Sequence, residues 1–326
     1  MSYKAMWQQY YPSHAPTFTE ADLIPGSHVG KVYLITGANS GIGLQLVKFL
    51  YPTGATIYLA GRSSSKISKA ISDIESTSSN LPSKGILKPL PGLDLSDLRT
   101  IKPVVETFAS QETQLHILWN NAASGFHPGA STPQGHEACI GTNAVGPFLF
   151  TSLLLPYLSA GSKSSTQPSR VIWTGSIQIE MNAPPGGIDF ERLSSGKTVL
   201  HHGDYAQSKC ANLLLAHEAA ARWGASHNVL SVCINPGNLN TNIFHEEPWL
   251  LVLLLRWLVL YEPRFGAYTM MFAGFSEQVT MAQNGCYVWP WGVIKENSRQ
   301  DVYKAIGEGL AGRFWEWCEE RVAEFK

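Results

Sequence analysis

The chain has 326 residues, a length that fits one large domain or two small ones. Hydrophobic residues make up 44% and charged residues 15%, so the chain is globular with a sizeable core and is not disordered. The formal net charge of −1, without a cluster of Lys and Arg, leaves no electrostatic footprint for nucleic-acid binding. The five cysteines are scattered and lack metal-ligand spacing, which favours reduced thiols and a cytoplasmic location.

The first 30 residues are interpreted as an N-terminal arm, and residues 31–326 as a single domain. The arm contains Pro12, Pro16, Pro25 and Gly26, which are residues typical of irregular chain. Its beginning is aromatic and polar and lacks the apolar stretch of a secretory signal.

A strand, a glycine turn and a helix follow one another at the start of the domain. Lys31–Thr36 is predicted to be a buried strand, and Leu44–Leu50 continues at helical spacing. The turn between them contains Gly37, Gly41 and Gly43, in the order GxxxGxG. Such a turn lets the backbone approach a pyrophosphate and lets the helix pack closely on the strand, with the helix N-terminus facing the anion. The context therefore predicts a dinucleotide site.

The second strand, Ala55–Ala60, ends at a basic residue rather than an acidic one. An NAD-selecting site places Asp or Glu about 20 residues after the glycines, where it holds the ribose 2′-hydroxyl. Here the strand end has Arg62, with Lys66 a turn later, and a guanidinium suits a 2′-phosphate. The sequence thus predicts NADP(H) over NAD(H), although Arg62 could also be an ordinary exposed loop residue.

The alternation of strands and helices continues along the chain. A third strand region ends at Leu93–Leu95, and the helical pattern of Leu98–Ala109 leads to a strand over Leu115–Trp119. Regular alternation predicts a parallel sheet with helices on both faces, which binds ligands at the carboxyl ends of its strands. Asp94 and Asn121 follow two of these strands, so each could contact the ligand or simply form a turn.

Two polar residues of the middle third stand where chemistry is expected. Asn143 lies in a long apolar helical pattern, Pro133–Leu158, near Pro147, and a proline within a helix bends it and frees a carbonyl. Asn143 could satisfy that kink, or hold a catalytic water or side chain. Ser176 ends the strand Arg170–Ser176 at the ligand edge of the sheet. No GxSxG surrounds it, so an acyl-transfer nucleophile is not supported.

Tyr205 is the one tyrosine of the twelve that has a lysine, Lys209, four residues later. On a helix these two side chains stand on one face, one turn apart. A neighbouring ammonium favours the ionised form of a phenol, so the pair can pass a proton to or from an alcohol or carbonyl oxygen. Without its context the same pair would be read as a solvated helix face.

The order and spacing of these motifs resemble the short-chain dehydrogenase/reductase family over about residues 31–241. The Ala-Gly-Arg-Ser turn and a Trp-rich C-terminal helix resemble retinol-dehydrogenase-like and fungal secondary-metabolism members. Two departures are mild: Ala123 replaces a usual glycine, and Gly175 replaces the first serine of a usual pair. The motifs that carry the resemblance are Thr36–Gly43, Asp94, Asn120–Ala123, Asn143, Ser176, Tyr205 with Lys209, and Pro236–Gly237.

The resemblance implies a single doubly wound α/β Rossmann domain, with a seven-stranded parallel sheet and helices on both faces, and a catalytic tetrad. Tyr205 would donate a proton to the carbonyl oxygen, and Ser176 would hydrogen-bond that oxygen as charge develops on it. Lys209 would hold the nicotinamide ribose and lower the pKa of Tyr205. Asn143 would anchor a water that leads from Lys209 towards solvent.

The resemblance also implies which residues contact the cofactor, which we expect to be NADP(H). They come from the glycine turn, the ends of the second, third and fourth strands, the catalytic pair and the turn after the sixth strand. The expected contacts are Gly37, Asn39, Ser40, Gly41, Ile42, Gly43, Arg62, Lys66, Asp94, Leu95, Asn121, Ala122, Ala123, Tyr205, Lys209, Pro236, Gly237, Leu239 and Thr241.

The last third contains the remaining predicted elements. His227–Asn235 reads as the sixth strand, Gly285–Trp289 as the seventh and Ser298–Phe325 as a final helix. Between them, Trp249–Leu260 is the most apolar stretch of the chain, and Arg256 interrupts it. It is shorter than the ~20 residues of a membrane span.

Trp249–Leu260 has two alternative interpretations: a lid helix over a hydrophobic pocket, or a helix that inserts into a membrane surface. The absence of a basic polar face favours the lid, within a substrate-covering segment of about residues 242–276.

Together these features predict an NADP(H)-dependent oxidoreductase that interconverts a ketone or aldehyde and an alcohol on a bulky, largely apolar substrate, in secondary-metabolite biosynthesis. We expect a small-molecule partner, with no metal and no nucleic acid; the oligomeric state stays open. Two alternatives remain: a membrane-associated retinoid or sterol dehydrogenase, and a non-catalytic protein that senses NADPH.

Overall fold

The structure is a computed structural model that describes residues 3–125, 129–195, 198, 201–240 and 259–326. Its centre is one eight-stranded sheet in the order β3-β2-β1-β4-β5-β6-β7-β8. Seven strands are parallel and β8 is antiparallel to β7. The strands are β1 (Val32–Thr36), β2 (Thr56–Gly61), β3 (Ile86–Pro91), β4 (Ile117–Asn120), β5 (Ser169–Thr174), β6 (Val229–Ile234), β7 (Tyr287–Trp289) and β8 (Val293–Ile294).

The doubly wound fold is confirmed, but the prediction of seven strands was one too few. Strand β8 is two residues long, which is too short to give a periodic hydrophobic signal in the sequence. Gly292, with a φ of +88°, lies in the tight turn that brings β8 back against β7.

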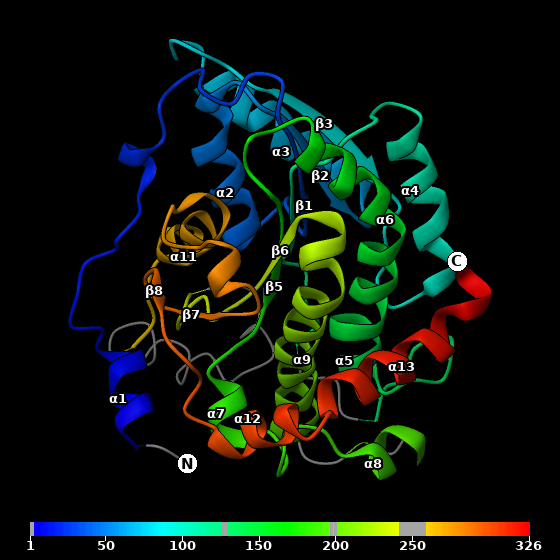
Figure 1. Ribbon diagram of the computed structural model, residues 1–326. Coiled ribbons are helices and arrows are strands. Elements are labelled where there is room, and N and C mark those ends of the chain that lie inside the picture. Colours follow the sequence, from blue (N-terminus) through cyan, green and yellow to red (C-terminus); the bar gives the residue numbers. More distant parts are fainter. Residues whose placement is uncertain (1–2, 126–128, 196–197, 199–200, 241–258) are drawn as a thin grey trace.

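Helices cover both faces of the sheet (Figure 1). One face packs against α2 (Gly41–Leu50), α3 (Ser64–Thr77) and α11 (Pro263–Phe275). The other face packs against α4 (Ile101–Ala109), α6 (Gly146–Lys163), α9 (His201–His227) and α13 (Leu310–Val322). The other α-helices of the described residues are α1 (Tyr3–Tyr10), α5 (Ala138–Ile140), α7 (Gln178–Asn182), α8 (Phe190–Ser195) and α12 (Gln300–Gly307).

Two helical predictions had the wrong boundaries. The pattern over Pro133–Leu158 begins as helix at Ala138 and widens into a π-helical turn over Gly141–Val145 before α6. The final helix, predicted over Ser298–Phe325, is two helices, because Gly309 between them has a φ of +90°. That left-handed conformation cannot continue an α-helix.

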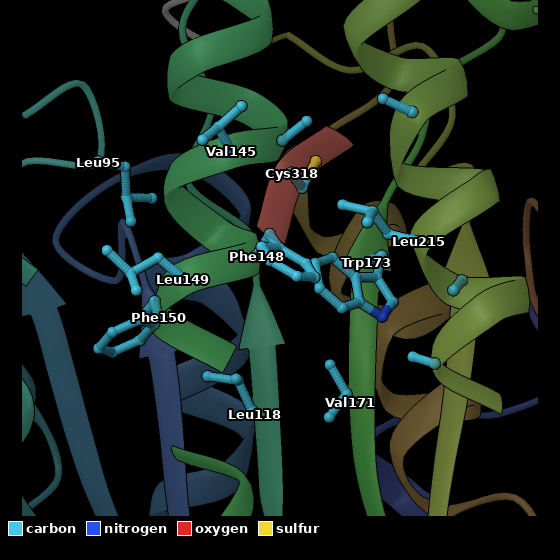
Figure 2. Close-up of a cluster of buried hydrophobic side chains, with 14 of the residues drawn as sticks. Leu95, Leu118, Val145, Phe148, Leu149, Phe150, Val171, Trp173, Leu215 and Cys318 are labelled. Atoms are coloured by element: carbon cyan, nitrogen blue, oxygen red, sulfur yellow. The ribbon is translucent and has the colours of Figure 1, made fainter. Parts of the chain in front are cut away.

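A dense apolar core fills the space between the sheet and the α6 and α9 helices. Figure 2 shows Phe148 and Leu149 of α6 against Leu118 and Trp173 of the sheet, with Leu215 of α9 beside them. Each of these side chains is almost fully buried, which contributes roughly 1.5–3 kcal/mol apiece to folding.

The apolar composition of the α6 region has a structural cause. Within the described residues, Ala138–Lys163 is the one helix long and apolar enough to cross a membrane by length and composition. Yet 78% of its most apolar window is buried inside the protein. Burial on that scale is typical of a core helix between the sheet and its neighbours.

The order of the strands explains where a ligand can bind. Strand β1 pairs with β2 on one side and with β4 on the other, so the chain reverses its direction of winding at this point. At such a switch point the loops after neighbouring strands diverge and leave a crevice outside the carboxyl ends of the strands.

Candidate active site

A cavity of about 770 Å³ lies at the carboxyl ends of the parallel strands. It gathers most residues that the sequence placed in the site. Its walls include Gly37, Asn39, Ser40, Gly41, Ile42, Arg62, Lys66, Asp94, Leu95, Asn121, Ala122, Ala123, Ser176, Tyr205, Lys209, Pro236, Gly237 and Leu239. Gly43 and Asn143 stand behind the walls, and Thr241 lies outside the described residues.

The glycine turn after β1 has the backbone geometry of a phosphate cradle. Gly37 and Gly41 have φ values of +67° and +55°, which favour glycine. A Cβ on Gly37 would stand 3.1 Å from the Ala122 Cα, so the loops after β1 and β4 nearly touch. The Ser40 side chain at the N-cap of α2 makes no capping hydrogen bond, which leaves the first amides of this helix for an anion. These features fit a dinucleotide.

Gly43, in the first turn of α2, has too little room for a side chain. An added Cβ would stand 2.7 Å from both the Gly37 carbonyl oxygen and the Asn121 Nδ2. We expect Gly43→Ala to lower the free energy of unfolding by about 1–3 kcal/mol, because the backbone must shift to make room. Chemical denaturation measures the loss. Gly307→Ala is the control, since no atom of the described residues lies within 4 Å of an added Cβ there, and equal stabilities for both variants would contradict the expectation.

Thr36, at the end of β1, connects the loops after β1 and β4 through hydrogen bonds. Its Oγ1 accepts hydrogen bonds from the backbone amides of Asn121 (3.0 Å) and Ala122 (2.9 Å). The Asn121 side chain donates back to the Thr36 carbonyl at 2.8 Å. The Asn121 side chain therefore shapes the cavity wall, and the signal for Thr36 was its place immediately before the glycine turn.

The far end of the cavity is basic. Arg62 and Lys66 line it with exposed side chains, and neither side chain has a hydrogen bond or ion pair with another described residue. Asp94, on the same stretch of wall, accepts hydrogen bonds at Oδ1 from the Ser96 amide (3.0 Å) and hydroxyl (2.6 Å). The turn-forming alternative for Asp94 thus applies, and Asp94 also lines the cavity.

The predicted proton-transfer residues meet at the other end. Ser176 follows β5 by two residues, and Tyr205 and Lys209 stand on successive turns of α9. The Lys209 Nζ lies 5.4 Å from the centre of the Tyr205 ring and donates to the Thr174 carbonyl oxygen at 3.0 Å. That carbonyl also accepts from the Asn212 side chain at 2.9 Å, so Thr174 and Asn212 hold the lysine in place.

Burial is the main influence on the pKa values of this pair. Tyr205 is 7% exposed and Lys209 is 1% exposed. Burial raises the pKa of Tyr205, and a hydrogen bond with Ser176 lowers it by a smaller amount. Burial lowers the pKa of Lys209 to about 8. The phenol therefore keeps its proton at neutral pH. A lowering of the Tyr205 pKa by Lys209 stays a prediction.

Asn143 is a neighbour of the site rather than part of its wall. Its Oδ1 accepts from the Ser124 amide at 2.7 Å, and its Nδ2 donates to the Ser124 carbonyl (3.1 Å) and the Ser208 hydroxyl (2.9 Å). Its carboxamide is therefore engaged in protein contacts and clamps a residue of the cavity wall. Pro147 has no N–H to donate to the Asn143 carbonyl four residues earlier. A water anchored by Asn143 stays a prediction.

An ion pair supports the first turn of α9. The Arg192 guanidinium on α8 contacts the Asp204 carboxylate, directly before Tyr205 in the chain. Both side chains are largely shielded from solvent, at 22% and 8% exposed. Neither residue was identified from the sequence, because the pair joins two short segments that show no common motif.

The chain matches known proteins over nearly its whole length. The family profile described as short chain dehydrogenase matches residues 31–187. The short-chain dehydrogenase/reductase iacJ of Pestalotiopsis fici is 52% identical, with 96% of each chain covered. The chain belongs to the short-chain dehydrogenase/reductase family. Another member, a short-chain dehydrogenase/reductase of Phomopsis amygdali, is 43% identical over 99% of this chain and 98% of that one.

Solved structures share the fold of this family member. A protein of Mycobacterium Paratuberculosis is 26% identical, with a TM-score of 0.67 and coverage of 94% of this chain and 97% of that one. The NADPH-bound carbonyl reductase from chicken fatty liver has a TM-score of 0.59 at 19% identity, covering 83% of this chain and 100% of that one. At this identity the second likeness shows the fold alone.

Proposed function

We propose that this short-chain dehydrogenase/reductase uses NADP(H) to interconvert a ketone or aldehyde and an alcohol. The observation that carries the proposal is the cavity itself. Ser176, Tyr205 and Lys209 line one end of it, and the glycine turn and Arg62 line the rest. A dinucleotide cradled by the turn would thus extend towards the proton-transfer residues, as the family resemblance implies.

The chain's own residues account for the proton chemistry. Tyr205 holds the proton that a carbonyl oxygen needs when it becomes an alcohol, and its raised pKa keeps that proton in place at neutral pH. Ser176 offers a hydroxyl to the same oxygen as negative charge develops on it. Lys209 presents an ammonium from the next turn of α9, where we place the nicotinamide ribose. The nicotinamide supplies the hydride when it is bound.

Arg62 is the reason for preferring NADP(H). Its exposed guanidinium stands on the cavity wall after β2, where an acidic side chain would select NAD(H). The fold by itself does not determine which of the two cofactors binds, because a Brucella melitensis 3-oxoacyl-[acyl-carrier protein] reductase of this fold has bound NAD. The free basic pair of Arg62 and Lys66 supports a 2′-phosphate instead.

We infer a bulky, largely apolar substrate and a reducing direction. Ile177, directly after Ser176, and Leu239 are apolar residues that line the cavity, and the protonated state of Tyr205 suits reduction. The apolar segment Trp249–Leu260 lies outside the described residues except at its last two positions. Fungal relatives support a place in secondary metabolism, and five free cysteines support the cytoplasmic location.

Incubation of the purified protein with NADPH and a panel of lipophilic ketones and aldehydes tests this function. Oxidation of NADPH that depends on the carbonyl compound supports it. NADPH binding without turnover of any compound would favour the sensor instead. Recovery of the full chain in a carbonate-washed membrane fraction would favour the membrane-associated alternative.

The Lys209 ammonium makes the reaction dependent on pH. Because the pKa of Lys209 is lowered to about 8, its charged form is present below that pH and is lost above it. Tyr205 stays protonated through this window, since its pKa is raised. We therefore expect kcat/KM for reduction to fall as pH rises through about 8. A kcat/KM that stays constant to pH 10 would contradict the assigned role of the ammonium.

A further inference from the structure

The N-terminal helix α1 packs against the body of the protein and forms hydrogen bonds with residues near the cavity. Gln9 is fully buried, although it lies in the segment that the sequence presents as an arm. The Tyr10 carbonyl accepts a hydrogen bond from the Tyr261 hydroxyl at 2.8 Å, and the Lys295 ammonium donates to the Gln8 side chain at 2.7 Å. Figure 1 shows α1 at the end of the molecule where α7 follows β5.

Gln9 takes part in a closed set of amide hydrogen bonds with the turn after β6. Its Oε1 accepts from the Asn235 Nδ2 at 2.8 Å. Its Nε2 donates to the Asn235 Oδ1 at 3.3 Å and to the Asn238 Oδ1 at 3.2 Å. One residue of α1 therefore holds both ends of the Asn235–Asn238 turn.

The direction of these bonds follows from the backbone. The Gly237 amide can only donate, and it donates to the Asn235 Oδ1 at 3.1 Å. Asn235 must then turn its Nδ2 towards Gln9, which fixes the Gln9 amide and places its Nε2 against the Asn238 Oδ1. The Asn238 Nδ2 is left buried, without a hydrogen-bond partner among the described residues. Buried polar groups without a partner are costly and gather at functional sites.

The turn that Gln9 holds belongs to the reactive end of the cavity. Pro236, Gly237 and Asn238 line the cavity together with Ser176. The strands that carry Ser176 and the turn are neighbours, and the Gly175 amide donates to the Ile234 carbonyl at 2.7 Å. A shift of the turn would therefore change the space beside Ser176.

We propose that Gln9 is a positioning residue of the active site, through which α1 holds the Pro236–Asn238 turn in the shape that receives the nicotinamide end of the cofactor. The inference rests on the proposed function for the identity of the cofactor. It adds a segment outside the family profile, which begins at residue 31, to the elements that build the site.

Gln9→Leu tests the proposal, because leucine occupies similar space but forms none of the three hydrogen bonds. We expect Kd for both NADPH and NADH to rise by a similar factor, about tenfold, since the turn lies away from Arg62. Fluorescence titration of each cofactor measures the change without turnover. Gln278→Leu, at an exposed glutamine that does not line the cavity, is the matched control and should bind both cofactors like the wild-type protein.

A double variant separates positioning from general destabilisation. The effects of Gln9→Leu and Asn238→Leu should be less than additive, because both variants remove the Gln9–Asn238 hydrogen bond, whereas independent effects would multiply in Kd. Unfolding curves of each variant show whether the folded fraction is complete during the titration. Unchanged cofactor affinity in folded Gln9→Leu, or fully additive effects, would overturn the proposal.

The two proposals fail separately. A tenfold change in cofactor affinity in a protein that reduces none of the carbonyl compounds would leave the role of α1 standing and remove the proposed reaction. Carbonyl reduction by the wild-type protein, with Gln9→Leu unchanged in Kd, kcat and KM, would support the proposed reaction and remove the role of α1.

Discussion

Tyr205→Phe is expected to lower turnover by about 10²- to 10⁴-fold, the range typical of the loss of a general acid. The phenol stands in the cavity with Ser176 and Lys209, and phenylalanine fills the same buried space without the proton. Cofactor affinity should change little, because the ring remains. Steady-state reduction of a carbonyl substrate with NADPH, combined with a titration of NADPH alone, measures both quantities.

Tyr33→Phe is the matched control for this result. Tyr33 is also buried, at 3% exposed, but it lies in the core of the sheet and outside the cavity. It should retain wild-type turnover. If Tyr205→Phe turned over as fast as Tyr33→Phe, the assignment of Tyr205 as the proton donor would be wrong.

Arg62→Asp is expected to reverse the cofactor preference. A hydrogen bond to a charged group is worth about 1.5–3 kcal/mol, so its loss should weaken NADPH binding by roughly 10- to 150-fold. The new carboxylate would repel a 2′-phosphate and accept a hydrogen bond from a 2′-hydroxyl, so NADH should lose much less. Binding titrations of both cofactors with the purified variant give the two ratios.

Lys69→Asp is a control for the change in charge. Lys69 stands on α3, 75% exposed and paired with Asp73, and it does not line the cavity. Its replacement should affect the two cofactors equally and slightly. Equal losses for NADPH and NADH in Arg62→Asp would instead assign Arg62 a structural role and remove the basis for NADP(H).

Local patterns carried much of the fold and the site. The strand, glycine turn and helix around Gly37 could be predicted because each depends on short-range chemistry: apolar burial, positive φ and helical spacing. The motifs that end at Ser176 and Pro236 could be placed because parallel strands bring their carboxyl ends to one edge. The cavity contains these residues together, as the order of the motifs indicated.

The sequence by itself determined which residue types meet at that edge, whereas the tertiary structure decided their surroundings. The pKa of Tyr205 depends on how completely the fold excludes water, so the direction of its shift could not be read from Lys209 four residues away. The partners of Asn143 depend on where the loop after β4 passes. The place of Gln9 depends on contacts with residues more than 220 positions later, and local periodicity carries no information about such contacts.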